Sequence, residues 1–241
     1  MSISSQIRYF FEKHKGIKQF FKPFYDRFYK QKALTRLNKK FRANALQVLE
    51  TFDNCMKEAG VNYTLAFGTL LGAVREKGFI KHDLDIDVMM WSDEYSETMK
   101  NILKNAGFKL IRLSLIEDGN RGREESYTLD GLNVDIFYIY PPVVELPYVS
   151  QFVSYPPYPT YELSMKKLGK VLPLRVELPL ARERKYVSFE TIQLPIPVNY
   201  DEILKYYYGD NYMIPDPNWS MGQFDRHIVE WREVHATYQT F

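Results

Sequence analysis

The sequence has a single cysteine, Cys55, among its 241 residues. One cysteine can form no intramolecular disulfide bond, and it excludes a zinc site built from several cysteines. No apolar run approaches the roughly 18 residues of a membrane-spanning helix, and no apolar signal-peptide core stands near the start. These absences predict a soluble, intracellular protein, whose length suits one large domain with a small attachment.

Acidic residues are nearly absent from residues 1–42, which contain Glu12 and Asp26 but 12 of the 32 Lys and Arg residues. The segment therefore carries a net charge of +10 and residues 43–241 carry −8, although the whole chain stands at +2. Because the acidic remainder would repel nucleic acid, we expect no nucleic-acid partner.

Apolar and aromatic side chains recur at helical spacing within this basic segment. They are Ile7, Phe10, Phe11, His14, Ile17, Phe21, Phe24 and Phe28. A basic aromatic amphipathic helix suits an anionic membrane surface, where each positive charge contributes about 1 kcal/mol. The alternative is that the stripe packs on the protein's own core. Gly16 and Pro23 are expected to bend or interrupt the helix.

The rest of the chain alternates between helix and strand patterns. We expect helices over Ala33–Ala59, from a Ser92 cap to Gly107, from an Asn199 cap to Tyr208, and over Gln223–Ala236. We expect strands over Asn62–Phe67, Asp83–Met90 and Phe108–Leu115, and a hairpin of Glu124–Leu129 and Leu132–Tyr140 around Asp130-Gly131. Twelve of the 13 prolines lie between Pro141 and Pro217, which predicts loops and short edge strands there.

Three carboxylates alternate along one predicted strand, at Asp83, Asp85 and Asp87. Alternate residues of a strand share a face, so the three side chains lie together and repel one another. A bound cation would relieve the repulsion, and oxygen ligands favour Mg²⁺ or Mn²⁺. A solvated acidic face is the alternative. Asp135 lies inside another, otherwise apolar strand, where burial is costly unless it shares that cation.

A Gly-Thr pair, Gly68-Thr69, opens a short helix that is predicted to run through Arg75. Backbone N–H groups at a helix start bind phosphate, and a glycine permits close approach. The pair is a weak signal by itself, but an Asp-Ile-Asp strand follows 16 residues later. This combination resembles the DNA polymerase beta-like nucleotidyltransferase superfamily.

Longer motifs resemble the LicD family within that superfamily, over about Asn62 to Pro217. They are Gly68 to Arg75, Lys77-Gly78-Phe79-Ile80, Asp83 to Asp87, Val134-Asp135-Ile136-Phe137 and Tyr208-Gly209-Asp210-Asn211-Tyr212. The family usually has Trp-Asp-Asp-Asp-Ile-Asp, and here His82 and Leu84 replace the Trp and the middle Asp. The resemblance implies an α+β fold, a nucleotidyltransferase-like mixed β-sheet flanked by helices. The expected domains are the basic amphipathic segment 1–42 and a LicD-like catalytic domain 43–241.

The resemblance also implies transfer of a phospho-alcohol (phosphocholine, ribitol phosphate or glycerol phosphate) from a CDP-activated donor. The acceptor would be a hydroxyl of a cell-surface glycan such as lipopolysaccharide, teichoic acid or capsule, free or on a lipid carrier. Mg²⁺ or Mn²⁺ held by Asp85, Asp87 and Asp135 would bridge the donor's diphosphate. Asp83 would bind a second metal or act as general base. The predicted substrate-binding residues are Gly68, Thr69, Arg75, Arg121, Arg123 and Asp210.

Each of the last four has a structural alternative: a surface ion pair for Arg75, a solvated loop for Arg121 and Arg123, and a helix end for Asp210. The predicted location is the cytoplasm, as a peripheral protein on the inner face of the cytoplasmic membrane. Two other functions stay open. One is a nucleotidyltransferase that attaches a nucleoside monophosphate to a small molecule or sugar, and the other is a non-catalytic protein that binds glycan or partners.

Overall fold

The computed structural model describes residues 15–81, 83–142, 149–155, 161–170, 172–216, 228–230 and 236–241. The chain divides into two compact units, Met1–Ala43 and Asn44–Phe241. Within the described residues, no helix combines the length and the apolar character that crossing a membrane requires.

Helix α2, Lys15–Ala59, begins in the first unit and ends in the second. It contains the predicted helix Ala33–Ala59 and extends it toward the N-terminus. Pro23 does not interrupt it, since helical turns continue on both sides of the proline. The predicted residues Ile7 to His14, and the side chains of the rest of that stripe, lie outside what the structure describes.

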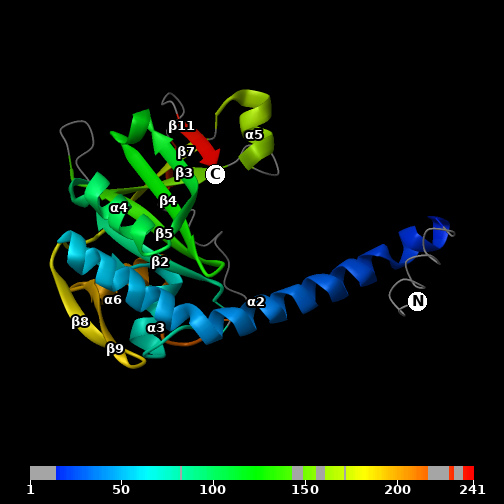
Figure 1. The fold of residues 1–241 in the computed structure, drawn as a ribbon, viewed down its shortest axis with the longest axis horizontal. Coiled ribbons are helices and arrows are strands. Elements are labelled where there is room, and N and C mark those ends of the chain that lie inside the picture. Colours follow the sequence, from blue (N-terminus) through cyan, green and yellow to red (C-terminus); the bar gives the residue numbers. More distant parts are fainter. Residues whose placement is uncertain are drawn as a thin grey trace. The chain divides into compact units, whose positions relative to one another are not determined.

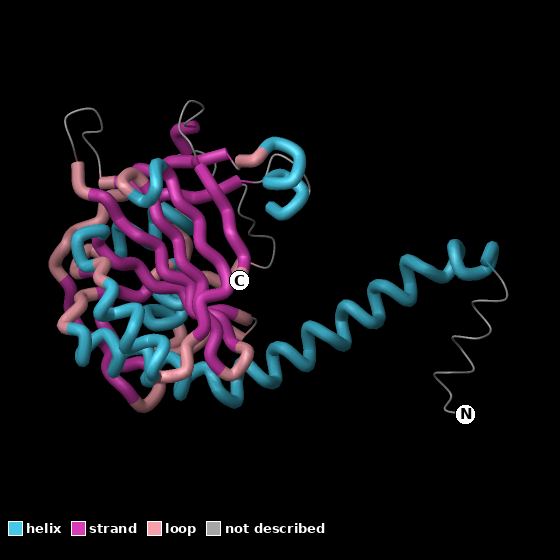
Figure 2. Tube along the Cα trace, turned by 45° about the horizontal axis from the view of Figure 1, so that its top comes forward, coloured by secondary structure: helices cyan, strands magenta, loops and turns pink. Residues whose placement is uncertain are grey.

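The second unit is built around a mixed sheet in which nine strands are described (Figures 1 and 2). In chain order they are β1 Tyr63–Leu65, β2 Asp85–Trp91, β3 Lys109–Ile116, β4 Gly122–Leu129, β5 Leu132–Tyr140, β6 Ser150–Tyr155, β7 Leu172–Glu177, β10 Ile228–Glu230 and β11 Ala236–Thr240. Their order is β10-β7-β6-β5-β4-β3-β11, with β2 beside β5 and β1 beside β2. The β2–β5 pair is parallel, and the other described pairs are antiparallel.

Helices lie against both faces of this sheet. The further helices are α3 Phe67–Arg75, α4 Glu97–Asn105, α5 Tyr161–Leu168 and α6 Tyr200–Tyr208, with short 3-10 turns η1 Ser92–Glu94 and η2 Glu117–Gly119. A separate hairpin pairs β8 Arg184–Phe189 with β9 Ile192–Pro197. Helices on both sides of a mixed sheet confirm the predicted α+β class.

Strand β2 buries one of its faces in the core. Ile86, Val88 and Met90 are almost inaccessible to solvent. The second half of α2 covers this side, where the ring of Phe52 meets that of Tyr63 edge-on at 5.2 Å between centroids. The predicted alternation is therefore confirmed from Asp85 to Met90, and the other face is left for Asp85 and Asp87. Asp83 was predicted on the same strand, but β2 begins only at Asp85.

Two predicted helices differ from the structure. Helix α4 is capped by Ser96, whose Oγ accepts a hydrogen bond from the Met99 N–H at 3.1 Å, whereas Ser92 begins the separate turn η1. The predicted helix Gln223–Ala236 is wrong at residues 228–230, which form strand β10 against β7. A β-branched pair, Ile228-Val229, favours that pairing over a helix.

The side-chain cap predicted at Asn199, before α6, is also absent. Asn199 directs its side chain elsewhere: Oδ1 accepts from the Ala181 N–H at 3.0 Å, and Nδ2 donates to Glu202 Oε2 at 3.1 Å. Asn199 therefore fastens the preceding loop to the helix start.

Candidate active site

The parallel pairing of β2 and β5 creates an acidic centre. Asp87 stands directly opposite Asp135 in the ladder, and Asp85 shares the face of Asp87 two residues earlier. One carboxylate oxygen from each of the three lies within 4.8 Å of the others. The structure thus brings together the three predicted metal ligands, which we call the carboxylate trio.

The chemistry of the trio fits a divalent cation. Burial and the neighbouring acids raise the pKa of Asp87 well above its ordinary value, and burial and Asp135 raise the pKa of Asp85. Asp135 Oδ1 is buried and has no hydrogen-bond partner in the described parts of the chain. A cation would satisfy that oxygen and offset the repulsion, and an all-oxygen donor set suits Mg²⁺ or Mn²⁺.

Asp83 lies in the turn before β2 and outside the trio. Its N–H donates to the Ile80 carbonyl at 3.1 Å. Burial, and then the charge of Asp85, raise its pKa to about 6, against a lowering effect of Arg75. Its carboxylate lies against the start of α3, since a Cβ added to Gly68 would stand 3.3 Å from Asp83 Oδ2.

The start of α3 adjoins the acidic centre. Ala66, at the N-cap, has no side chain that could satisfy the first amides of the helix. Thr69 is buried, and its Oγ1 accepts a hydrogen bond from the backbone N–H of Asp87 at 3.0 Å. The predicted phosphate-binding helix is therefore tied directly to the strand that carries two of the carboxylates.

The end of α3 is closed by a tight backbone contact. A Cβ added to Gly72 would stand 2.4 Å from the carbonyl oxygen of Gly78, a separation that no side chain can occupy. The turn after α3 therefore packs closely against the helix, and the chain continues from this turn to Asp83 and β2.

Arg75 and Tyr208 complete this side of the site. The Arg75 guanidinium contacts Glu76 Oε1 at 2.9 Å and the Tyr212 carbonyl at 3.3 Å. Burial and the charges of Asp87, Asp83 and Asp85 raise the pKa of the Tyr208 hydroxyl, whereas Arg75 opposes the rise. From the motif Tyr208 to Tyr212, the sequence analysis predicted Asp210 as a substrate-binding residue, but Asp210 is exposed.

Two further residues, Arg112 and Glu124, reach the trio from β3 and β4. Arg112 Nη2 contacts Glu124 Oε1 at 2.8 Å and Asp135 Oδ2 at 3.3 Å. Burial raises the pKa of Glu124 to about 7, although Arg112 lowers it. Neither residue was predicted. Polar residues in both strands were visible in the sequence, but only the pairing register relates them to Asp135.

The structure does not bring Arg121 and Arg123 to the trio. Arg121 forms an ion pair with Glu117 at 2.9 Å in the turn before β4. Arg123 contacts the buried Glu125 at 2.7 Å and lies 4.0 Å from the centroid of the Tyr95 ring. Because successive residues of a strand face opposite sides, Arg123 lies across the sheet from Glu124.

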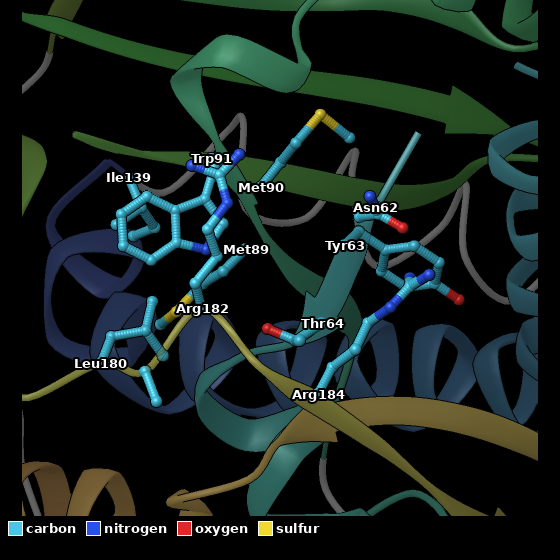
Figure 3. Close-up of a pocket in the computed structure, with 11 residues that line it drawn as sticks. Asn62, Tyr63, Thr64, Met89, Met90, Trp91, Ile139, Leu180, Arg182 and Arg184 are labelled. Carbon is cyan, nitrogen blue, oxygen red and sulfur yellow. The ribbon is translucent and has the colours of Figure 1, made fainter. Parts of the chain in front are cut away.

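A separate hollow lies near the far end of β2 (Figure 3). The Arg182 guanidinium lies 5.1 Å from the centroid of the Trp91 ring and pairs with both carboxylate oxygens of Asp93 at 2.7 and 2.8 Å. The residues that line it include none of the trio. Among the described residues, its lining includes Arg182 and Arg184 but no acidic residue that could hold a cation, so we place the candidate active site at the carboxylates.

Comparisons with known proteins identify the same region. Residues 60–152 match the family model described as LicD/FKTN/FKRP, nucleotidyltransferase domain. Over 50 residues, the chain is 48% identical to "Lipopolysaccharide cholinephosphotransferase LicD" of Haemophilus influenzae. That stretch covers 21% of this chain and 19% of the relative, so the two align over only about a fifth of their lengths. The resemblance to the LicD family that the motifs predict is therefore confirmed for residues 60–152, the segment that carries the carboxylate trio.

Proposed function

We propose that this chain is a metal-dependent phosphotransferase, which moves a phospho-alcohol from a CDP-activated donor onto a hydroxyl of a cell-surface glycan. The observation that carries the proposal is the trio of carboxylate oxygens within 4.8 Å of one another. The name of the relative favours phosphocholine as the group and lipopolysaccharide as the acceptor. Ribitol phosphate and glycerol phosphate, with teichoic acid or capsule, complete the set of candidates to be tested.

Each part of the site has a role in this reaction. Asp85, Asp87 and Asp135 would hold Mg²⁺ or Mn²⁺, and the cation would supply positive charge against the charge that develops on the phosphate oxygens. The first amides of α3, at Gly68 and Thr69, receive a phosphate group. These residues thus orient an anionic donor in a site that would otherwise repel it.

Asp83 is the proposed general base. With a pKa of about 6, it is mostly ionised at neutral pH yet basic enough to accept a proton. The acceptor oxygen forms a bond to the phosphorus that carries the alcohol while the phosphoanhydride bond breaks. The hydroxyl proton passes to Asp83, and CMP leaves with the bonding electron pair.

The basic segment 1–42 is proposed to hold the protein on the inner face of the cytoplasmic membrane. The support is its charge of +10 and its aromatic content. Removal of residues 1–30 should abolish sedimentation with anionic vesicles and leave turnover of a soluble acceptor unchanged. Equal sedimentation of the full and shortened chains contradicts this part of the proposal.

The reaction itself is tested with CDP-choline, CDP-ribitol and CDP-glycerol, each labelled in the cytosine and in the alcohol. We expect Mg²⁺-dependent release of labelled CMP and transfer of the alcohol label to glycan. Asp85→Asn should abolish both, whereas Asp118→Asn, an exposed control with a φ of 56° that Asn also adopts, should retain them. Turnover by Asp85→Asn at the wild-type rate overturns the proposal, and cytosine label on the acceptor identifies a nucleotidyltransferase instead.

A further inference from the structure

A row of polar side chains crosses four neighbouring strands on the face of the carboxylate trio. Arg112 of β3 pairs with Ser126 of β4, Ser126 pairs with Asp135 of β5, and Asp135 pairs with Asp87 of β2. Residues directly opposite each other in paired strands project from the same face of the sheet. The acidic centre therefore continues sideways toward Arg112.

Arg112 is held at the edge of this row by a buried acid. Its Nη2 lies 2.8 Å from Glu124 Oε1, and the Glu124 side chain is only 8% exposed. The same nitrogen lies 3.3 Å from Asp135 Oδ2, while 28% of the Arg112 side chain remains accessible to solvent. One end of the guanidinium is thus anchored beside a proposed metal ligand, and part of the side chain faces solvent.

Two buried oxygens beside Arg112 lack partners in the described residues. They are the hydroxyl oxygen of Ser126, a residue that is 2% exposed, and Asp135 Oδ1. Buried polar atoms are normally satisfied, so an oxygen-rich ligand or its bound cation is the simplest missing partner. A guanidinium has five N–H donors, so one arginine can contact more than one anion, as Arg112 does with Glu124 and Asp135.

We propose that Arg112 binds a phosphate oxygen of the donor's diphosphate beside the carboxylate trio. Glu124 is a positioning residue that acts through Arg112. The inference rests on the proposed function, since it assumes that the trio faces a diphosphate. The Arg112 guanidinium supplies a positive charge on a surface where the three carboxylates would otherwise repel an anion.

The test measures binding of inorganic pyrophosphate in the presence of Mg²⁺ by calorimetry. Loss of a charge-assisted hydrogen bond predicts that Arg112→Gln weakens binding by about ten- to a hundred-fold. The rise in unfolding temperature on addition of Mg²⁺ alone should persist, because the trio is intact. Arg182→Gln is the matched control, since it removes an arginine that pairs with an acid at the surface, and it should bind pyrophosphate as the wild type does.

A double-mutant cycle tests whether Glu124 acts by positioning Arg112 or whether its loss weakens binding through a general disturbance of the fold. If Glu124 acts through Arg112, Glu124→Ala weakens pyrophosphate binding in the wild type but has no further effect in Arg112→Gln. Should Arg112→Gln fail to fold, Arg112→Lys keeps the charge without the planar fork and is expected to lose part of the affinity. If Arg112→Gln folds and binds pyrophosphate as the wild type does, the proposed role of Arg112 is wrong, but the proposed function stands. If Arg112→Gln does not fold, the same conclusion follows from normal binding by Arg112→Lys. A wild-type protein that responds to neither Mg²⁺ nor pyrophosphate overturns the proposed function with it.

Discussion

Replacement of Asp87 by Asn should stabilise the protein when no divalent cation is present. The change keeps the shape of the side chain and removes one of three like charges whose oxygens lie within 4.8 Å. Coulomb's law at that separation gives about 3.5 kcal/mol for one pair at an effective dielectric constant of about 20, and about 0.9 kcal/mol in water. Asp85 is the most exposed of the three residues, so its repulsion is closer to the lower value, whereas the Asp87–Asp135 pair is more sheltered.

We therefore expect a gain of about 1–3 kcal/mol in the free energy of unfolding. This gain is below the sum of the pairwise repulsions because the attraction between Arg112 and Asp135 already offsets part of the repulsion in the wild-type protein. For a protein of this size, that gain raises the unfolding temperature by about 2–12 °C. The gain should depend on pH. The pKa of Asp87 is raised in the folded state, so the wild-type protein loses stability as pH rises above the ordinary value of 3.8, and the variant lacks this loss.

The assay is thermal and urea unfolding in EDTA at pH 5 and pH 8, with Asp118→Asn as the surface control. The advantage of Asp87→Asn should be larger at pH 8, and it should disappear in Mg²⁺ because only the wild-type protein gains from the cation. A variant that is no more stable than the wild type in EDTA at pH 8 refutes the idea that the trio is a repulsive cluster awaiting a cation.

Three further predictions concern other parts of the domain. Stabilisation by Mg²⁺ should increase between pH 5 and pH 8, because protons compete with the cation for Asp85 and Asp87, whose pKa values are raised; a flat profile in unfolding temperature contradicts this. Ser96→Ala should cost about 1 kcal/mol in urea unfolding and Ser92→Ala less than about 0.5, since only the first caps α4; equal costs contradict the assignment. Gly72→Ala should destabilise the protein more than Gly60→Ala, which has a positive φ but nothing within 4 Å; similar unfolding temperatures would show that the backbone around α3 can yield.

Much of the acidic centre could be predicted from local patterns. Period-two alternation placed Asp85 and Asp87 on one strand face, and a lone acid in an apolar strand indicated that Asp135 needed a partner. Both inferences use only a few neighbouring residues, and each depends on a strong physical rule: the pleat of a strand and the cost of burying a charge.

The remaining contacts depend on strand pairing between distant segments. Arg112 occupies an ordinary alternating position in β3, and nothing near it in sequence shows that Glu124 and Asp135 will adjoin it. Tyr208 likewise needs the packing of α6 against α3. The wrong helix over residues 228–230 has the same cause, because β7 supplies the hydrogen bonds that decide for a strand.

The parallel ladder between β2 and β5 makes the spacing within β5 as important as its composition. Asp135 stands opposite Asp87 because the strand runs without a break from the Asp130-Gly131 turn. Deletion of one residue between Gly131 and Asp135 would move Asp135 to the opposite, apolar face and bring a hydrophobic residue into the trio. An insertion or deletion of a single residue here would therefore remove one carboxylate from the trio and leave it as a buried, unpaired charge on the opposite face.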